Sequence, residues 1–262
     1  MQKISVITIN YNNKEGLEKT IKSIISQTYS NIEYIVIDGG STDGSKEIIQ
    51  KYANQISFWV SEKDKGIYNA MNKGIAQAHG EYCNFMNSGD TFYDNKVLED
   101  IFSQNQSADI ITGITKLDTV PATYWYPPKE VSFNTMCYGT ISHQGSFIKT
   151  TLLKKHYYDE TIPIVADWAF FLQTLIIENC TYISLERNIC SYDMTGISST
   201  TPYDKERKYV LEKMFPDRIL IDFYDKAYKE TLYNRYENSS DFGKKMITLS
   251  SIIASKIFHK KK

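Results

Sequence analysis

The sequence predicts an α/β protein built around a mainly parallel central sheet. Short β-branched runs alternate with amphipathic segments of helical period over residues 1 to about 115. The chain has 262 residues, which is enough to bury a sizeable core, and its apolar share of 42% is ordinary for a globular protein. Strands that alternate with helices form parallel sheets through crossover connections, so we expect helices on the faces of one sheet.

The first part of the chain is expected to hold four strands and three helices. The run Ile4–Ile9 is short and β-branched, as buried parallel strands are. Leu17 and Ile21 follow at helical spacing, which predicts a helix over Lys14–Gln27. The later elements are a strand at Tyr34–Ile37, a helix around Ile48 and Tyr52, a strand at Ser57–Val60, a helix over Ile67–Ala78 and a strand at Tyr82–Met86.

The alternation ends after Gly113. Three prolines and three aromatic residues between 121 and 128 indicate an irregular or edge segment. The elements expected after it are a strand at His143–Lys149, a helix over Asp167–Glu178, strands at Tyr182–Leu185 and Ile189–Tyr192, and helices from Tyr203 onward. We therefore expect a main domain over 1–200, divided into halves 1–115 and 116–200, and a C-terminal helical extension over 201–262.

Composition excludes several classes of protein. The formal net charge of −1 does not produce the positive field that nucleic-acid binding needs. The four cysteines form no Cys-x-x-Cys pair, so we expect free thiols and a reducing compartment. No apolar run reaches the length of a membrane span, and no signal-peptide core is visible at the N-terminus. A cytoplasmic location is expected.

Polar side chains follow the predicted strands where each strand ends. Thr8 and Asn10 close the first strand, Asp38 the second, and Asn87 and Asp90 follow the fourth. Ligands of open α/β sheets bind outside the carboxyl ends of the strands. Asp90 is suited to a divalent cation that shares a substrate phosphate, and the set predicts a nucleoside diphosphate across the strand ends. The alternative is that 87–90 is an ordinary turn, because Asn, Ser, Gly and Asp dominate turns.

Two common nucleotide sites are excluded by the first turn. A dinucleotide site needs Gly-x-Gly-x-x-Gly between the first strand and helix, whereas residues 10–16 read Asn-Tyr-Asn-Asn-Lys-Glu-Gly. The chain also lacks a Walker A sequence. The nucleotide is therefore expected to be held by side chains rather than by a glycine-rich loop.

Four ordered blocks carry a resemblance to a known family. They are Ile-Thr-Ile-Asn-Tyr-Asn-Asn at 7–13, Val-Ile-Asp-Gly-Gly-Ser-Thr-Asp-Gly-Ser at 36–45, Ser-Glu-Lys-Asp-Lys-Gly-Ile-Tyr-Asn-Ala-Met-Asn-Lys-Gly at 61–74 and Asn-Ser-Gly-Asp at 87–90. With these blocks the chain resembles the inverting glycosyltransferases of family 2, which have the GT-A fold, and in particular those of bacterial polysaccharide and lipooligosaccharide synthesis. The resemblance is strong over about 1–115 and weaker through 142–144 and 166–168.

The resemblance implies roles for individual residues. It implies that Asp38 contacts the donor's base, usually uracil, and that Asp64 lies near the base or ribose. It also implies that Asp90 is the metal-binding last acid of an Asp-x-Asp motif and that Asp167 is the catalytic base. Asn87 and Gly89 stand where many relatives carry aspartates, and Ala166 replaces a glutamate often found before the base. Two interpretations of His143 stay open, a contact with the diphosphate or acceptor and a buried structural histidine.

The expected activity is transfer of a sugar from a UDP-type donor to a hydroxyl of a glycan or lipid-linked acceptor, assisted by Mg²⁺ or Mn²⁺. The alternative is a non-catalytic sugar-nucleotide-binding protein with the same fold. A sugar-phosphate nucleotidyltransferase is not expected, because the chain lacks a glycine-rich, arginine-containing loop after the first strand.

The C-terminal end carries a further expectation. Met246, Leu249, Ile253 and Ile257 fall on one helical face before a basic tail at 259–262. Such a helix is suited to lie on the anionic inner face of a membrane. The alternative is a helix packed on the protein with a solvated lysine tail.

Overall fold

The computed structural model describes residues 1–196 and 201–224. The chain forms two compact units, Met1–Arg207 and Lys208–Lys262. The predicted sheet and every predicted site residue belong to the first unit. The C-terminal apolar face at 246–257 lies outside the described residues, so the expected membrane contact stays a prediction. None of the helices within the described ranges combines the length and the apolar character that crossing a membrane requires.

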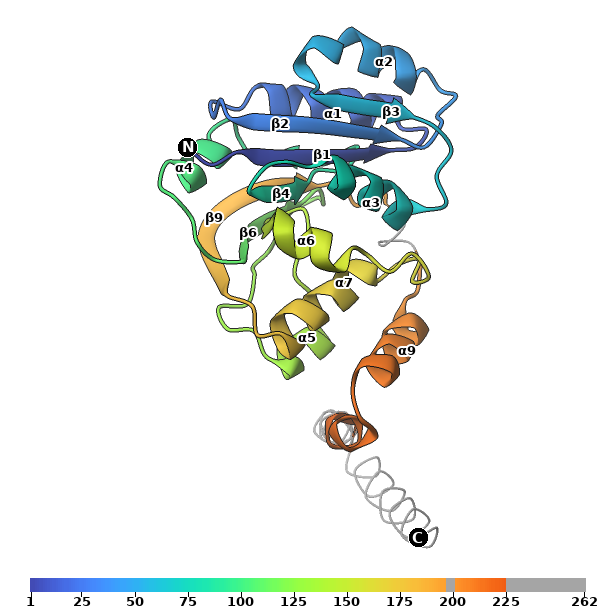
Figure 1. Ribbon diagram of the computed structural model, residues 1–262, viewed down its shortest axis with the longest axis vertical. Coiled ribbons are helices and arrows are strands. Elements are labelled where there is room, and N and C mark those ends of the chain that lie inside the picture. The colour runs from blue at the N-terminus through green and yellow to red at the C-terminus, as the bar shows by residue number, and fades with distance from the viewer. Residues whose placement is uncertain (197–200, 225–262) are drawn as a thin grey trace, which may run out of the picture. The chain divides into compact units, whose positions relative to one another are not determined.

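The first part of the sheet is parallel, as expected. Its strands occur in the order β3, β2, β1, β4, and their bounds are β1 Ile4–Asn10, β2 Ile32–Asp38, β3 Phe58–Ser61 and β4 Tyr82–Phe85. Helices lie against this sheet (Figure 1), with bounds α1 Lys14–Ile25, α2 Ser45–Lys51, η1 Ala53–Gln55 and α3 Ile67–Gln77. This confirms the α/β class and brings the ends of β1, β2 and β4 to one edge.

The second part of the sheet is mixed rather than mainly parallel. Its strands are β5 Thr91–Phe92, β6 Ile110–Leu117, β7 Thr123–Trp125, β8 Ser146–Lys149 and β9 Tyr182–Tyr192. The order continues from β4 through β8, β6, β9 and β5, and only the β6–β9 pair is parallel among these described strands. The helices are α4 Val97–Phe102, α5 Phe133–Tyr138, α6 Thr150–His156, α7 Ala166–Phe171, the π-helix η2 Leu172–Ile177 and α9 Asp204–Met214.

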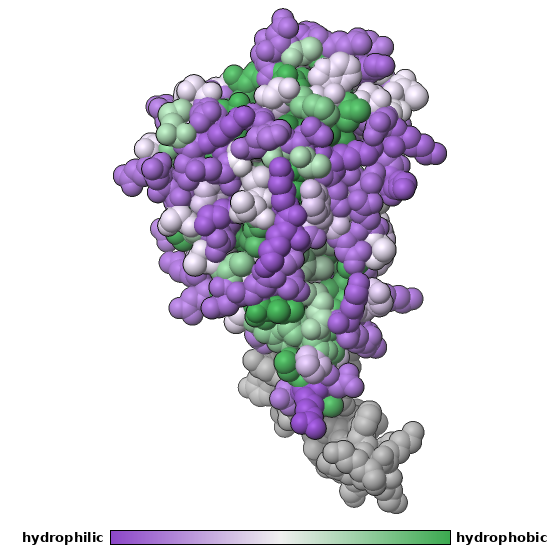
Figure 2. Space-filling view, in the orientation of Figure 1, coloured by the Kyte–Doolittle hydropathy of each residue, from purple (hydrophilic) through white to green (hydrophobic). Residues whose placement is uncertain are grey.

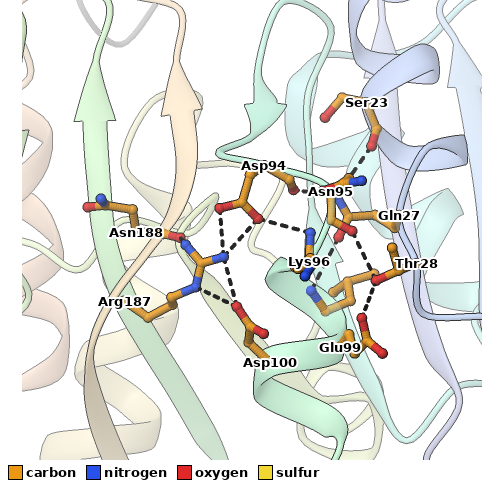
Figure 3. Close-up of polar contacts among 11 residues, drawn as sticks. Ser23, Gln27, Thr28, Asp94, Asn95, Lys96, Glu99, Asp100, Arg187 and Asn188 are labelled. Carbon is orange, nitrogen blue, oxygen red and sulfur yellow. Dashed lines mark hydrogen bonds and ion pairs between the residues drawn. The ribbon is translucent and has the colours of Figure 1, made fainter.

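The prediction of two strands at 182–192 was wrong, because β9 runs unbroken through the polar residues 186–188. The pairing of β9 with β6 shifts register around Ile114. The strand is therefore irregular at this point but does not end. The Arg187 guanidinium in this stretch bonds Asp94 at 2.8 Å and Asp100 at 3.0 Å. Figure 3 shows both carboxylates turned toward Arg187. The polar residues thus tie β9 to the segment that enters α4.

The same segment is tied to the start of the chain. Gln27 Nε2 donates to the carbonyl of Asp94 at 2.7 Å, and the backbone N–H of Thr28 donates to the carbonyl of Asn95 at 2.8 Å (Figure 3). These bonds hold the end of α1 against the connection from β5 to α4. The two halves of the first unit are therefore joined by polar contacts on this side, in addition to the sheet.

The core forms because helices place one apolar face on the sheet. In α1 the fully buried Leu17, Ile21 and Ile24 recur at helical spacing, and Asn13 caps the helix by accepting from the N–H of Gly16 at 3.0 Å. In α3 a Cβ on Gly74 would lie 2.4 Å from Cγ2 of Ile7, so only glycine permits this approach to β1. The face shown in Figure 2 is mainly hydrophilic, which agrees with an apolar interior.

A buried carboxylate stabilises the opposite edge of the sheet. Glu33, which is 7% exposed, accepts from Ser5 Oγ at 2.6 Å, from Lys3 Nζ at 3.0 Å and from the backbone N–H of His79 at 2.6 Å. Burial alone would raise the pKa of Glu33, but these hydrogen bonds lower it to about 2, compared with 4.5 for a free glutamate.

We expect Glu33→Gln to lower the free energy of unfolding at pH 7 by roughly 3 kcal/mol, the scale of this pKa shift. Because the folded-state pKa is depressed, the contribution is complete above pH 4.5 and is lost as the pH falls toward 2. Urea titrations at pH 7, 4.5 and 3.5 measure the difference from the wild type. The exposed Glu130→Gln is the matched control, and a pH-independent difference would contradict the assignment.

Candidate active site

A cavity of about 750 Å³ opens at the carboxyl ends of β1, β2 and β4. Its wall is built from the turns after these strands, the start of α3, the loop before β8, the start of α7 and the end of β9. Six predicted site residues line it, namely Asn10, Asp64, Asn87, Asp90, His143 and Asp167. The parallel strands bring Asn10, Asn87 and Asp90 together, because their carboxyl ends meet at one edge, whereas His143 and Asp167 come from the loop before β8 and from α7.

Thr8 and Asp38 do not line the cavity, and both are fully buried beneath it. The Thr8 hydroxyl donates to the carbonyl of Met86 at 2.7 Å, which fixes the end of β4. The two Asp38 carboxylate oxygens accept from Asn10, Ser41 and Ser61 side chains at 2.6 to 2.7 Å. Burial opposes ionisation of Asp38, but these bonds hold its pKa below the usual range. The geometry gives both residues a role in shaping the floor, and their contacts with a donor stay predictions.

Asp64 lies at the far side of the floor, next to the turn after β2. Its Oδ1 is 2.6 Å from Lys73 Nζ, and Lys73 also pairs with Glu62 at 2.7 Å. A Cβ on Gly39 would lie 3.1 Å from Asp64 Oδ2 and 3.1 Å from the ring of Tyr11. Because Gly39 has no side chain, Asp64 and Tyr11 both face the cavity, and Tyr11 is 69% exposed.

Asp167, His143 and Asn87 form a hydrogen-bonded chain across the cavity. Asp167 Oδ2 is 2.9 Å from Nδ1 of His143, and Nε2 of His143 is 3.3 Å from Nδ2 of Asn87. Tyr68, in the first turn of α3, donates its hydroxyl to Asp167 Oδ1 at 2.8 Å. The chain joins α3, α7, the loop before β8 and the turn after β4. His143 lines the cavity with both ring nitrogens bonded within the protein, so its contact with the diphosphate or acceptor stays a prediction.

The surroundings of Asp167 favour its ionised form. Burial acts to raise its pKa, but hydrogen bonds from His143 and Tyr68 hold the pKa below the usual range. Each carboxylate oxygen has two lone pairs, so both oxygens can still accept a bond from an incoming hydroxyl. Asp167 is therefore a carboxylate at neutral pH, positioned by two neighbours, in the wall of the cavity.

The pKa of Asp90 is shifted in the opposite direction to that of Asp167. Asp90 is 3% exposed, and its Oδ1 accepts from the backbone N–H of Asp193 at 2.8 Å. Burial raises the pKa of Asp90 to about 7, against the smaller lowering by that bond and by His143. A carboxylate desolvated to this degree is stabilised by a nearby positive charge.

The residues around Asp90 fit a hard divalent cation. Asn87 Oδ1 is buried and has no hydrogen-bond partner, and the Asp193 carboxylate lies beside Gly89, where a Cβ would be 2.5 Å from Asp193 Oδ2. Oxygen donors of this kind suit Mg²⁺ or Mn²⁺. The described residues contain no cluster of three His, Cys, Asp or Glu side chains that would hold a metal alone. Further oxygen ligands, such as water or the phosphate oxygens of a substrate, would complete such a site.

Sequence reasoning missed Tyr68, Asp193 and Gln144. Tyr68 stands inside the block 61–74, and only the fold brings it to Asp167, 99 positions away. Asp193 lines the cavity and follows the last residue of β9. A carboxylate directly after a predicted strand could have identified it from the sequence. Gln144 also lines the cavity and bonds Asp90 through its side chain.

Comparisons with known proteins agree with this arrangement. The family model described as glycosyl transferase family 2 matches residues 5–176. The chain is 33% identical over 214 residues to the glycosyltransferase Rv1514c of Mycobacterium tuberculosis, covering 75% of this chain and 77% of that one. It is 38% identical over 113 residues to the cholesterol galactosyltransferase of Borreliella burgdorferi, covering 42% of this chain and 31% of that one.

Solved structures show the same fold. S. aureus TarS 1–349 in complex with UDP-GlcNAc is similar with a TM-score of 0.65 at 20% identity, covering 80% of this chain and 64% of that one. The mannosyltransferase PcManGT from Pyrobaculum calidifontis, in complex with GDP-Man and Mn²⁺, has a TM-score of 0.63 at 14% identity and covers 97% and 80%. At these identities the likeness shows the GT-A fold alone. With the family model and the mycobacterial relative, it establishes that the chain belongs to glycosyltransferase family 2.

Proposed function

We propose that the chain is an inverting glycosyltransferase that moves a sugar from a nucleoside diphosphate donor, UDP in the first instance, to a hydroxyl of a glycan or lipid-linked acceptor. One observation carries this proposal. The ionised Asp167 and the turn at Asn87 and Asp90 line one cavity and are joined through His143. A proton acceptor and a site for a diphosphate therefore face the same space.

The reaction is a single displacement at the anomeric carbon of the donor. The acceptor hydroxyl gives its proton to the Asp167 carboxylate as its oxygen forms the new glycosidic bond. The bond from the anomeric carbon to the diphosphate breaks, and the nucleoside diphosphate leaves with the electron pair. Tyr68 and His143 keep the carboxylate oriented by their bonds to its two oxygens. Attack from the face opposite the leaving group inverts the configuration.

Asn87, Asp90 and Asp193 are the residues that would hold a divalent cation. Bound there with the donor, the cation offsets the negative charge on the leaving diphosphate. Glycosidases use a second carboxyl group to protonate the leaving oxygen, and the nucleoside diphosphate needs no such acid. The orphaned Asn87 oxygen and the desolvated Asp90 support this assignment.

The choice of UDP rests on the family resemblance and on TarS, which has been solved with UDP-GlcNAc and with UDP. PcManGT was solved with GDP-Man, so GDP-sugars are the competing donors. We place the activity in bacterial polysaccharide or lipooligosaccharide synthesis in the cytoplasm, at the inner face of the membrane where lipid-linked acceptors are made. The C-terminal segment is the proposed contact with that surface.

A panel of UDP- and GDP-sugars tests the proposal. The full chain is incubated with each donor and Mn²⁺, and release of the nucleoside diphosphate and thermal stabilisation are measured. We expect both signals with a UDP-sugar. Stabilisation without product in a single-turnover experiment with candidate acceptors would favour the non-catalytic sugar-nucleotide-binding alternative.

Asp167→Asn keeps the size of the side chain and removes its basicity. We expect turnover to fall by about 10²–10⁴, the usual range for loss of a general base. Affinity for UDP, measured by calorimetry, stays within about twofold of the wild type, since the amide oxygen of the variant can still accept from His143 Nδ1 and hold the ring in place. The matched control is the exposed Asp222→Asn, which keeps full activity. Near-wild-type turnover in Asp167→Asn would place the base elsewhere.

Chelation and Asp90→Ala test the cation. We expect excess chelator to abolish transfer, Mn²⁺ or Mg²⁺ to restore it, and Asp90→Ala to lower turnover by about 10²–10³, as for other groups that stabilise a developing charge. Mn²⁺ binding followed by electron paramagnetic resonance with UDP present should weaken in Asp90→Ala and in Asp193→Asn. Undiminished turnover in excess chelator would rule out a metal-assisted mechanism.

A further inference from the structure

The segment that leads into α7 presents Asp167 to the cavity, yet it lacks a local cap. Residues 163–165 precede the helix, and Pro163 and Ile164 line the cavity beside Asp167. Val165 occupies the N-cap position and makes no side-chain capping bond. The backbone N–H groups of Ile164 and Val165, just before the first turn, therefore need acceptors from elsewhere in the fold. Local sequence therefore does not explain what holds the proposed base in place.

The acceptor comes from the far end of the first unit. Glu206, in the first turn of α9, accepts with Oε2 from the backbone N–H of Ile164 at 3.0 Å and of Val165 at 2.8 Å. The contact spans 41 to 42 positions of sequence. In Figure 1 the start of α9 lies beside the loop that enters α7. One carboxylate thus holds two consecutive peptide groups next to Asp167.

The opposite edge of this segment is held by the same tyrosine that binds the base. The Tyr68 hydroxyl lies 2.7 Å from the carbonyl of Ile164 and 2.8 Å from Asp167 Oδ1. Ile164 is therefore bound through its N–H by Glu206, and its carbonyl shares the single hydroxyl proton of Tyr68 with Asp167 Oδ1. A shift of the Ile164 peptide would therefore disturb both Tyr68 and Asp167.

The residue after Glu206 reinforces the attachment. The guanidinium of Arg207 lies 4.7 Å from the centre of the Trp168 ring and 4.9 Å from that of Tyr203. Trp168 is 1% exposed and donates its indole N–H to the carbonyl of Met136 at 2.8 Å. Trp168 follows Asp167 directly, so the start of α9 contacts the chain on both sides of the proposed base.

We propose that Glu206 is a positioning residue for the transfer reaction, holding the 164–165 backbone so that Asp167 keeps its place and its bond to Tyr68. The inference rests on the proposed function of Asp167 as the base. Glu206 is not among the residues that line the cavity, so it acts through Asp167 and not on the substrate. The first turn of α9 then supports the position of Asp167, although the sequence predicts a helical extension there.

Glu206→Ala in the full chain removes both bonds. We expect kcat for a UDP-sugar to fall by about 10–10², the scale on which small misplacement of a catalytic group lowers rate. The affinity for UDP and the KM for the donor stay within about twofold of the wild type. Glu206→Gln keeps an oxygen acceptor without the charge and should give an intermediate kcat. Glu212→Ala, an exposed glutamate of the same helix, is the matched control and keeps wild-type kcat.

Amide hydrogen exchange gives a readout that needs no substrate. Exchange at Ile164 and Val165 should speed up in Glu206→Ala and stay unchanged in Glu212→Ala. Faster exchange with an unchanged kcat would overturn the positioning role and leave the proposed function intact. Unchanged exchange would overturn the contact itself. A wild type without transfer activity, together with faster exchange in the variant, would refute the proposed function instead.

Discussion

The hydrogen bond between Asp167 and His143, at 2.9 Å, is the interaction on which the proposed site depends. It joins α7 to the loop before β8, and through His143 it reaches the turn after β4, where Asn87 lies. Three segments from both halves of the first unit are therefore held in one register by a single imidazole. Because both ring nitrogens are within bonding distance of partners, the orientation of this ring is determined, and with it the distance between the two ends of the cavity.

The two carboxylates of this cavity, Asp167 and Asp90, have pKa values shifted in opposite directions. Hydrogen-bond donors outweigh burial at Asp167 and lower its pKa, whereas burial outweighs the donors at Asp90 and raises its pKa to about 7. The first state suits a proton acceptor and the second suits a ligand that gains a positive neighbour. Aspartate side chains at two positions of one cavity thus differ in pKa, because the donors and charges around them differ.

Polar contacts also hold the second half of the unit in place around these residues. Arg187 binds two carboxylates at the entry to α4, and β9 then continues to Asp193 at the cavity. Glu206 binds the backbone that carries Asp167 from the other side. The strand ends supply the floor of the site, and these longer-range contacts set its walls.

Local pattern in the sequence determined β1 to β4, the helices between them and the strand-end residues, but not β5, α4 or β6. β-branched runs and helical spacing predict β1 to β4 and their helices, because each such pattern is a property of neighbouring residues. Only the tertiary structure decided the mixed second half, the unbroken β9, and which residues shape the cavity rather than line it. Asp38, Tyr68 and Glu206 show the reason. Their roles depend on partners 23 to 99 positions away in the sequence. Local sequence patterns describe neighbouring residues and do not predict such contacts.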